Sequence, residues 1–112
     1  MSANELLSDY TCTENYYRLY AGLVYTDGVQ TLCSNFKCYW LLDVIASYQY
    51  KLKSEDFQAW KLVKQENDSA MVTCDDGNGN ILVQQWIPFT DFEMSGATVW
   101  VECNVILLPS EH

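Results

Sequence analysis

The sequence contains no lysine or arginine after Lys64. All 6 basic residues come earlier, whereas eight of the 15 acids follow that point: Glu66, Asp68, Asp75, Asp76, Asp91, Glu93, Glu102 and Glu111. The net charge of −9 disfavours direct binding to nucleic-acid phosphates or to an anionic membrane surface. It favours capture of a basic protein instead. The alternative is that the acids serve solubility alone.

Long apolar runs are also missing. No stretch reaches the roughly 18 uninterrupted apolar residues of a membrane-spanning helix. Residues 1–5 lack the basic segment that opens a secretory signal, and no long apolar run follows them. The sequence therefore predicts a protein of the cytoplasm with no membrane partner.

Residues for metal binding or nucleophilic catalysis are few and poorly spaced. The single histidine, His112, ends the sequence, where we expect mobility, so a Cys–His pair is not predicted. The 5 cysteines lack zinc-type pairs, since Cys33 and Cys38 are five positions apart. In a reducing cytoplasm they are expected to be free thiols. We expect no catalytic residue, no metal site and no cofactor.

Apolar side chains, in contrast, are plentiful. They make up 49% of the 112 residues, and aromatic side chains make up 14%. This is enough for one modest core, so residues 1–112 are predicted to form a single acidic domain. The 4 Trp and 8 Tyr either fill that core or face a partner.

The first half of the sequence carries helix signals. Ser2 and Glu5 have the spacing of a capping box, Thr26 is a cap for the next helix, and Asn35 is a second cap. The predicted helical segments are 2–10, 27–34 and 36–50. Between the first two, residues 16–25 predict a short strand or an extended segment that is broken at Gly22.

The segment 36–50 is apolar on nearly every side, which is typical of a helix central to a core. Asp43 is the single acid within it. An unpaired buried carboxylate is costly, so Asp43 should either lie at an exposed edge or bond to a Tyr hydroxyl or a backbone amide. A catalytic acid is the functional alternative.

From residue 57 the apolar period changes to two. Four strands are predicted, at 57–64, 70–74, 81–87 and 98–107. Short turns between them favour an antiparallel meander. The predicted fold is therefore α+β, with N-terminal helices packed on a C-terminal antiparallel sheet of about four strands.

The segment 75–80 is rich in Asp, Asn and Gly. These residues suit a hairpin turn that needs positive φ, and they also suggest a weak cation site. The segment lacks the EF-hand spacing. It leads to a strand and has no nearby lysine, so it does not match a phosphate-binding loop. A turn is the favoured prediction.

The acids of the base-free half are the candidate partner-binding residues: Glu66, Asp68, Asp75, Asp76, Asp91, Glu93 and Glu102. With no base among them, they are expected to give the sheet half a potential of one sign. Such a surface could occupy a groove that is built for nucleic-acid phosphates. The hypothesis requires several of these acids to share one face.

Several motifs together resemble a known family. They are TENYYR at 13–18, YTDGV at 25–29, YWLLD at 39–43, IASYQ at 45–49, FQAWKL at 57–62, TC at 73–74, IPFTDF at 87–92 and LLPSE at 107–111. In this order they resemble an uncharacterised family of small single-domain proteins from bacteria, phages and mobile elements, known as a domain of unknown function. The segment from Cys33 to Cys38 departs from that pattern, because it is richer in cysteine.

The resemblance implies a small accessory protein and brings no catalytic residues. The leading hypothesis is a non-enzymatic binding protein that engages a basic surface of a bacterial protein or nucleoprotein complex. Its most concrete form is an anti-CRISPR or other counter-defence inhibitor that acts in the host cytoplasm, with a nucleic-acid mimic as one version. The alternative is a homodimeric accessory protein of a mobile element that pairs through exposed aromatics. An enzyme would need a deep pocket around Asp43.

Overall fold

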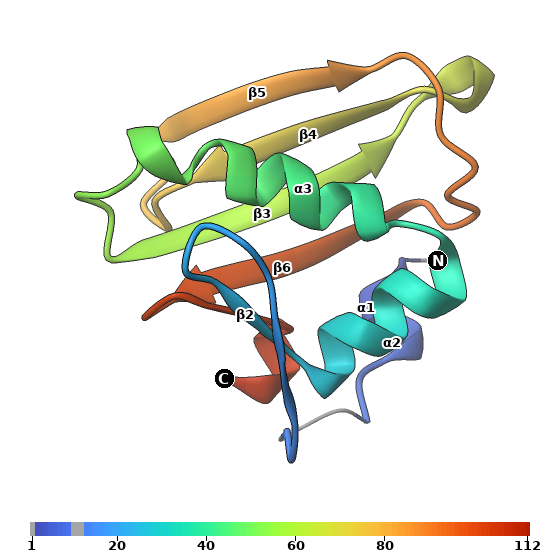
Figure 1. The fold of residues 1–112 in the computed structure, drawn as a ribbon. Coiled ribbons are helices and arrows are strands. Elements are labelled where there is room, and N and C mark those ends of the chain that lie inside the picture. Colours follow the sequence, from blue (N-terminus) through green and yellow to red (C-terminus); the bar gives the residue numbers. More distant parts are fainter. Residues whose placement is uncertain (1, 10–12) are drawn as a thin grey trace.

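The computed structural model describes residues 2–9 and 13–112 (Figure 1). The described chain forms a seven-stranded sheet in the order β1-β2-β7-β6-β3-β4-β5. All neighbouring strands are antiparallel except β2 and β7, which run parallel. The strands are β1 (Tyr16–Arg18), β2 (Val24–Thr26), β3 (Phe57–Lys64), β4 (Ala70–Asp75), β5 (Ile81–Ile87), β6 (Gly96–Glu102) and β7 (Val105–Leu107).

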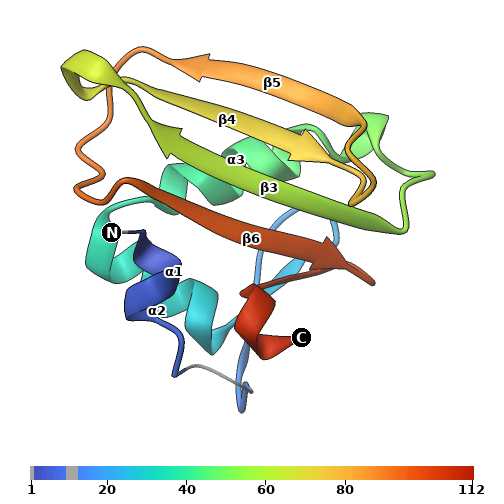
Figure 2. The ribbon, with the colours of Figure 1, turned by 180° about the vertical axis from the view of Figure 1, so that it is seen from behind.

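Short helices accompany the sheet. Helix α3 crosses one face over β3 (Figure 1), while α1 and the last helical turn, η3, lie against β6 on the other face (Figure 2). The helices are α1 (Ala3–Leu6), α2 (Asp27–Phe36) and α3 (Tyr39–Ser47), with 3-10 turns η1 (Gln49–Lys51), η2 (Glu66–Asp68) and η3 (Pro109–Glu111). None of the described helices has the length and apolar character that crossing a membrane requires.

The core lies between α3 and the sheet. Alternate residues of β3 point inward, so that Trp60 and Leu62 are buried against the apolar side of α3. A buried indole needs a hydrogen-bond acceptor, and the Trp60 Nε1 donates to the Gln58 Oε1 at 3.0 Å. Gln58 in turn forms a reciprocal amide pair with Gln49, with distances of 2.9 and 3.0 Å. Both the amide oxygen and the amide nitrogen of the buried Gln58 therefore have hydrogen-bond partners.

The predicted sheet of about four antiparallel strands is wrong. The chain has a seven-stranded mixed sheet with three short α-helices among its described residues. Strands β1 and β2 lie at the two ends of the segment 16–25 that was predicted as a short strand or an extended segment, but they were not counted in the sheet. Strand β2 joins it by parallel pairing of Val24 with Val105. Pairing between strands so far apart in sequence leaves no local pattern, which is why periodicity did not indicate it.

The predicted strand at 98–107 is in fact a hairpin. The chain reverses at Cys103 and Asn104, whose φ angles are 53° and 63°, and β7 returns beside β6. Apolar alternation continues on both sides of this reversal, so the pattern resembles one long strand. Asn tolerates the left-handed conformation better than most residues, but no glycine marks the turn.

The caps separate into confirmed and wrong predictions. The capping box of Ser2 and Glu5 is present, and the Thr26 side chain caps α2. The cap predicted at Asn35 is wrong, because α2 continues through that residue to Phe36 and ends with Lys37 in the left-handed region. The helix predicted at 36–50 is shorter, spanning Tyr39–Ser47. Residue 10 of the first predicted helix lies outside the described residues.

The end of the chain is tied to the start of α2 by Glu111. Its Oε1 accepts a hydrogen bond from the Thr26 hydroxyl at 2.6 Å, and its Oε2 accepts one from the Gly28 N–H at 3.2 Å. The same carboxylate accepts a bond from the Leu108 N–H at 2.9 Å. A negative group at a helix N-terminus also interacts favourably with the helix dipole. A Cβ at Gly28 would approach the Glu111 carboxylate to 2.7 Å, so any larger residue would displace this carboxylate.

Replacing Glu111 by alanine should lower the free energy of unfolding by about 1–3 kcal/mol, because it leaves the Gly28 N–H and the Thr26 hydroxyl without their acceptor. Urea denaturation followed by circular dichroism measures the change. Glu93→Ala is the matched control, since Glu93 is exposed, and it should stay within about 0.5 kcal/mol of the parent. Equal effects of the two substitutions would contradict the role of Glu111.

Candidate functional site

The structure separates the candidate acids into two groups at opposite ends of β3. Asp75 and Glu102 lie where β3 begins, because Asp75 pairs with Ala59 and Glu102 with Phe57. Eight residues at roughly 3.3 Å each place the other end about 25 Å away. The second group lies there: Glu66, Asp68, Asp91 and Glu93. The seven acids therefore do not form one continuous surface.

The second group lies in a mixed-charge end of the sheet, where bases from the first half of the chain are close. The Lys64 Nζ is 3.8 Å from the Asp68 Oδ1, and the Lys37 Nζ is 3.9 Å from the Asp91 Oδ2. Lys64 also donates to the Phe92 carbonyl. Exposed pairs of this kind stabilise little, but the two lysines partly neutralise the negative potential that was expected here. Counting charges along the sequence missed these bases because the fold brings them in from β3 and α2.

The first group is larger than the sequence indicated. The acidic end, as we name it, consists of Glu55, Asp56, Asp75, Asp76 and Glu102. Its effect is visible at Cys74, where burial chiefly, and then the charges of Asp75, Glu55 and Asp76, raise the thiol pKa to about 12.

Sequence reasoning missed Glu55 and Asp56, because they belong to the half that is nearly neutral. A usable signal was their position directly before β3. In an antiparallel meander, the start of one strand lies beside the end of the next strand along the chain.

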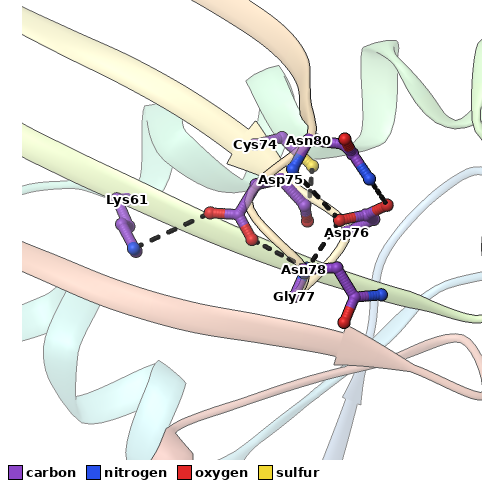
Figure 3. A network of polar contacts seen from close by, with 7 residues as sticks. All are labelled: Lys61, Cys74, Asp75, Asp76, Gly77, Asn78 and Asn80. Carbon is purple, nitrogen blue, oxygen red and sulfur yellow. Dashed lines mark hydrogen bonds and ion pairs between the residues drawn. The ribbon is translucent and has the colours of Figure 1, made fainter.

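Asp75 and Asp76 are held by their own turn (Figure 3). The Asp75 side chain is only 13% exposed, lies 3.7 Å from the Lys61 Nζ, and accepts a bond from the Gly77 N–H at 2.8 Å. The Asp76 carboxylate accepts bonds from the Asn80 side chain and the Asn78 N–H, both at 2.8 Å. These bonds, the Asn80 side chain first, hold the pKa of Asp76 below its usual value.

The turn predicted at 75–80 is confirmed. Gly77 has φ of +87°, and a Cβ there would meet the Phe57 ring at 3.0 Å, so this position requires glycine. The carboxylates bond to backbone and amide groups of the turn itself. No group of three or more potential metal-binding side chains occurs among residues 2–9 and 13–112.

A groove adjoins the acidic end. It has a volume of about 760 Å³ and lies between η1, the segment 52–58 and the turn from β6 to β7. Glu55, Asp56 and Glu102 line this acidic groove, and Lys53 is the single lysine or arginine in its lining. Neither Glu55 nor Asp56 forms an ion pair with another described residue. The groove is thus a negatively charged concavity.

The remaining walls of the acidic groove combine amides and aromatic rings with apolar side chains such as Leu52 and Val101. Gln49 and Gln58 line it, and their reciprocal hydrogen bonds keep both side chains in place. Tyr50 lines it as well, with 66% of the residue exposed. The Lys51 Nζ lies 5.7 Å from the centre of the Tyr50 ring, so this ring already makes a cation–π contact within the chain. Glu102 contacts His112 through its Oε1, at 3.2 Å from the Nε2.

Asp43 is not placed for acid catalysis. It is exposed on α3, and the Tyr20 hydroxyl donates to its backbone carbonyl at 3.1 Å rather than to its carboxylate. Of the two structural alternatives, exposure is the one that occurs, and it avoids the cost of burying the charge.

The described cysteines are free thiols, and Cys12 lies outside the described residues. Cys33, Cys38 and Cys74 are buried, whereas Cys103 is exposed. The neighbouring Cys38 and burial raise the pKa of the Cys33 thiol far above its ordinary value. A thiol that stays protonated is a poor nucleophile, so Cys33 has a structural role.

Asp76 offers a direct test of the turn. Because the pKa of Asp76 is lowered, its hydrogen bonds stabilise the fold fully at pH values above about 4, the ordinary pKa of aspartate. This stabilisation is lost as the pH falls through the lowered pKa of Asp76. Asn80→Ala should raise the pKa of Asp76, as measured by NMR titration of its carboxyl carbon. Asn78→Ala is the control, because Asn78 bonds to Asp76 through its backbone N–H. An unchanged pKa in the Asn80 variant would refute the assignment.

Comparisons with known proteins gave one result. Neither the curated proteins nor the solved structures include a match to the chain. The family of unknown function DUF6876 matches residues 1–112. This match extends over every motif that suggested the resemblance and over the Cys33–Cys38 segment that departs from it. The chain therefore belongs to the family of unknown function DUF6876.

Proposed function

We propose that the chain is a non-enzymatic binding protein whose acidic groove receives basic side chains from the surface of a partner protein. The observation that carries the proposal is the shared lining of one cavity by Glu55, Asp56 and Glu102, with the exposed Tyr50 beside them. Carboxylates in a concave surface accept charge-assisted hydrogen bonds from lysine or arginine. The exposed Tyr50 ring beside them adds apolar contact area for the stem of such a side chain.

The walls of the groove support this proposal, because they are held in advance of binding. The amide pair of Gln49 and Gln58 is anchored to the Trp60 indole and to the Ile45 carbonyl, the latter at 3.0 Å. A site whose side chains are already ordered loses less conformational entropy on binding. The net charge of −9 also speeds the approach of a basic partner and repels nucleic-acid phosphates.

The most specific form of the proposal is an inhibitor of host defence. It would be encoded by a phage or other mobile element, and it would act in the bacterial cytoplasm on a basic protein or nucleoprotein complex, as an anti-CRISPR protein does. Small size and strong negative charge support this form. Because Lys37 and Lys64 partly neutralise the mixed-charge end, any imitation of a nucleic acid would depend on the acidic end alone.

Reversing two charges of the groove tests the proposal. The double variant Glu55→Lys/Asp56→Lys should weaken binding of a fluorescent oligo-arginine peptide by about tenfold or more, because it replaces two acceptors of charge-assisted bonds with repelling groups. Fluorescence anisotropy measures the dissociation constant. Binding by the parent chain should weaken as salt is added.

The matched control is Glu66→Lys/Glu93→Lys, which makes the same change of net charge at the mixed-charge end. It should alter the dissociation constant much less than the groove variant. Equal losses in the two variants would mean that the peptide responds only to the total charge. Binding that is independent of salt would also overturn the proposal. Circular dichroism confirms that both variants fold.

A further inference from the structure

The two edges of the sheet differ in how they are protected. Strand β1 forms one edge with three residues that include Arg18, while β5 forms the other with seven residues, Ile81–Ile87. Proteins usually block an edge with charged residues, proline or a very short strand, because its unpaired N–H and C=O groups can pair with another chain. Strand β5 contains no charged residue and no proline. It is an unprotected edge.

The outer side of β5 is open. Among the described residues its backbone pairs with β4 alone, and Figure 2 shows no element beyond it. Two large apolar residues of the strand are exposed, Ile81 at 60% and Trp86 at 51%. An irregularity in pairing lies near the start of the strand, between Cys74 and Asp75 on β4, so residues 83–87 form its regular part.

Trp86 continues an apolar row across the face that α3 leaves open. It pairs in register with Met71 on β4, and Met71 pairs with Val63 on β3. Val63 is 47% exposed, and Met71 is partly buried. The row ends at the free edge, where a strand added beside β5 would cover Trp86.

We propose that this edge binds a second copy of the chain, with the two β5 strands antiparallel across a two-fold axis. The edge groups of β5 require an extended strand as their partner, and β5 is complementary to itself. With the axis at Gln85, Val83 of one copy lies opposite Ile87 of the other on the side of the sheet that α3 covers. Gln84 then lies opposite Trp86 on the open side. Antiparallel pairs of this kind stabilise a sheet.

Charge selects this arrangement over others. Two chains of net charge −9 repel each other, so contact is most favourable along a strand that carries no charge. The antiparallel two-fold places the acidic end of one copy beside the mixed-charge end of the other, where Lys64 lies. Parallel pairing of the two strands would bring the two acidic ends together. A basic partner, in contrast, is attracted to the acidic end.

Sedimentation velocity on the full chain tests the proposal. The parent should sediment as a species of twice 12.9 kDa at high concentration. Trp86→Lys and, separately, Gln84→Lys should each raise the dimer dissociation constant by roughly tenfold. The reason is that the two-fold axis brings the added lysines of the two copies close together between the paired β5 strands. The control Val63→Lys lies on the same open face, two strands away from the edge, and should leave the dissociation constant unchanged.

The result that overturns the proposal is a parent that sediments as a single chain, or a dimer that persists in both edge variants. Loss of the dimer in the Val63→Lys variant alone would assign the contact to the face instead. Two further readouts separate this proposal from the function of the groove. Added salt should strengthen the dimer by screening the repulsion, whereas it weakens binding in the groove. The Glu55→Lys/Asp56→Lys variant should remain dimeric.

Discussion

The pairing of β3 on both of its sides is the constraint on which the rest of the structure depends. It bonds to β6 along seven of its residues and to β4 along six, which fixes the direction and the ends of the central strands. Every acid that precedes or follows these strands is thereby assigned to one end of the sheet. Because β3 carries Lys61 and Lys64, the same pairing brings bases to Asp75 and Asp68.

The same strand connects the core with the acidic groove. Its inward residues begin with Gln58 and continue with Trp60 and Leu62, so the polar wall of the groove is also the end of the apolar core. Gln58 can be buried there because Gln49 and the Trp60 indole satisfy its amide. Outside this paired network the chain turns at Lys53 and Ser54. Glu55 and Asp56 follow that turn in the lining of the groove, and water reaches both of them.

The molecule offers two surfaces that use different forces. The acidic groove carries three carboxylates in its lining, so its attraction for a basic group is long-ranged and sensitive to salt. The free edge of β5 has no charge, and its unpaired backbone groups act only at contact. The two surfaces lie at different borders of the sheet, so both can be occupied together. A member of the DUF6876 family with both surfaces engaged would present two acidic grooves on one continuous sheet.

The sequence by itself determined the local features of this protein. The caps at Ser2 and Thr26, the turn at 75–80 and the strands near 57–64, 70–74 and 81–87 follow from the residue types at neighbouring positions, which set the backbone conformation directly. Only the tertiary structure decided the parallel pairing of β2 with β7, the reversal at Cys103 and Asn104, and the grouping of the acids. Those features depend on residues that are distant in sequence. Charge counted along the chain therefore showed which acids follow the last base, whereas the pairing of distant strands decided which of those acids lie near one another.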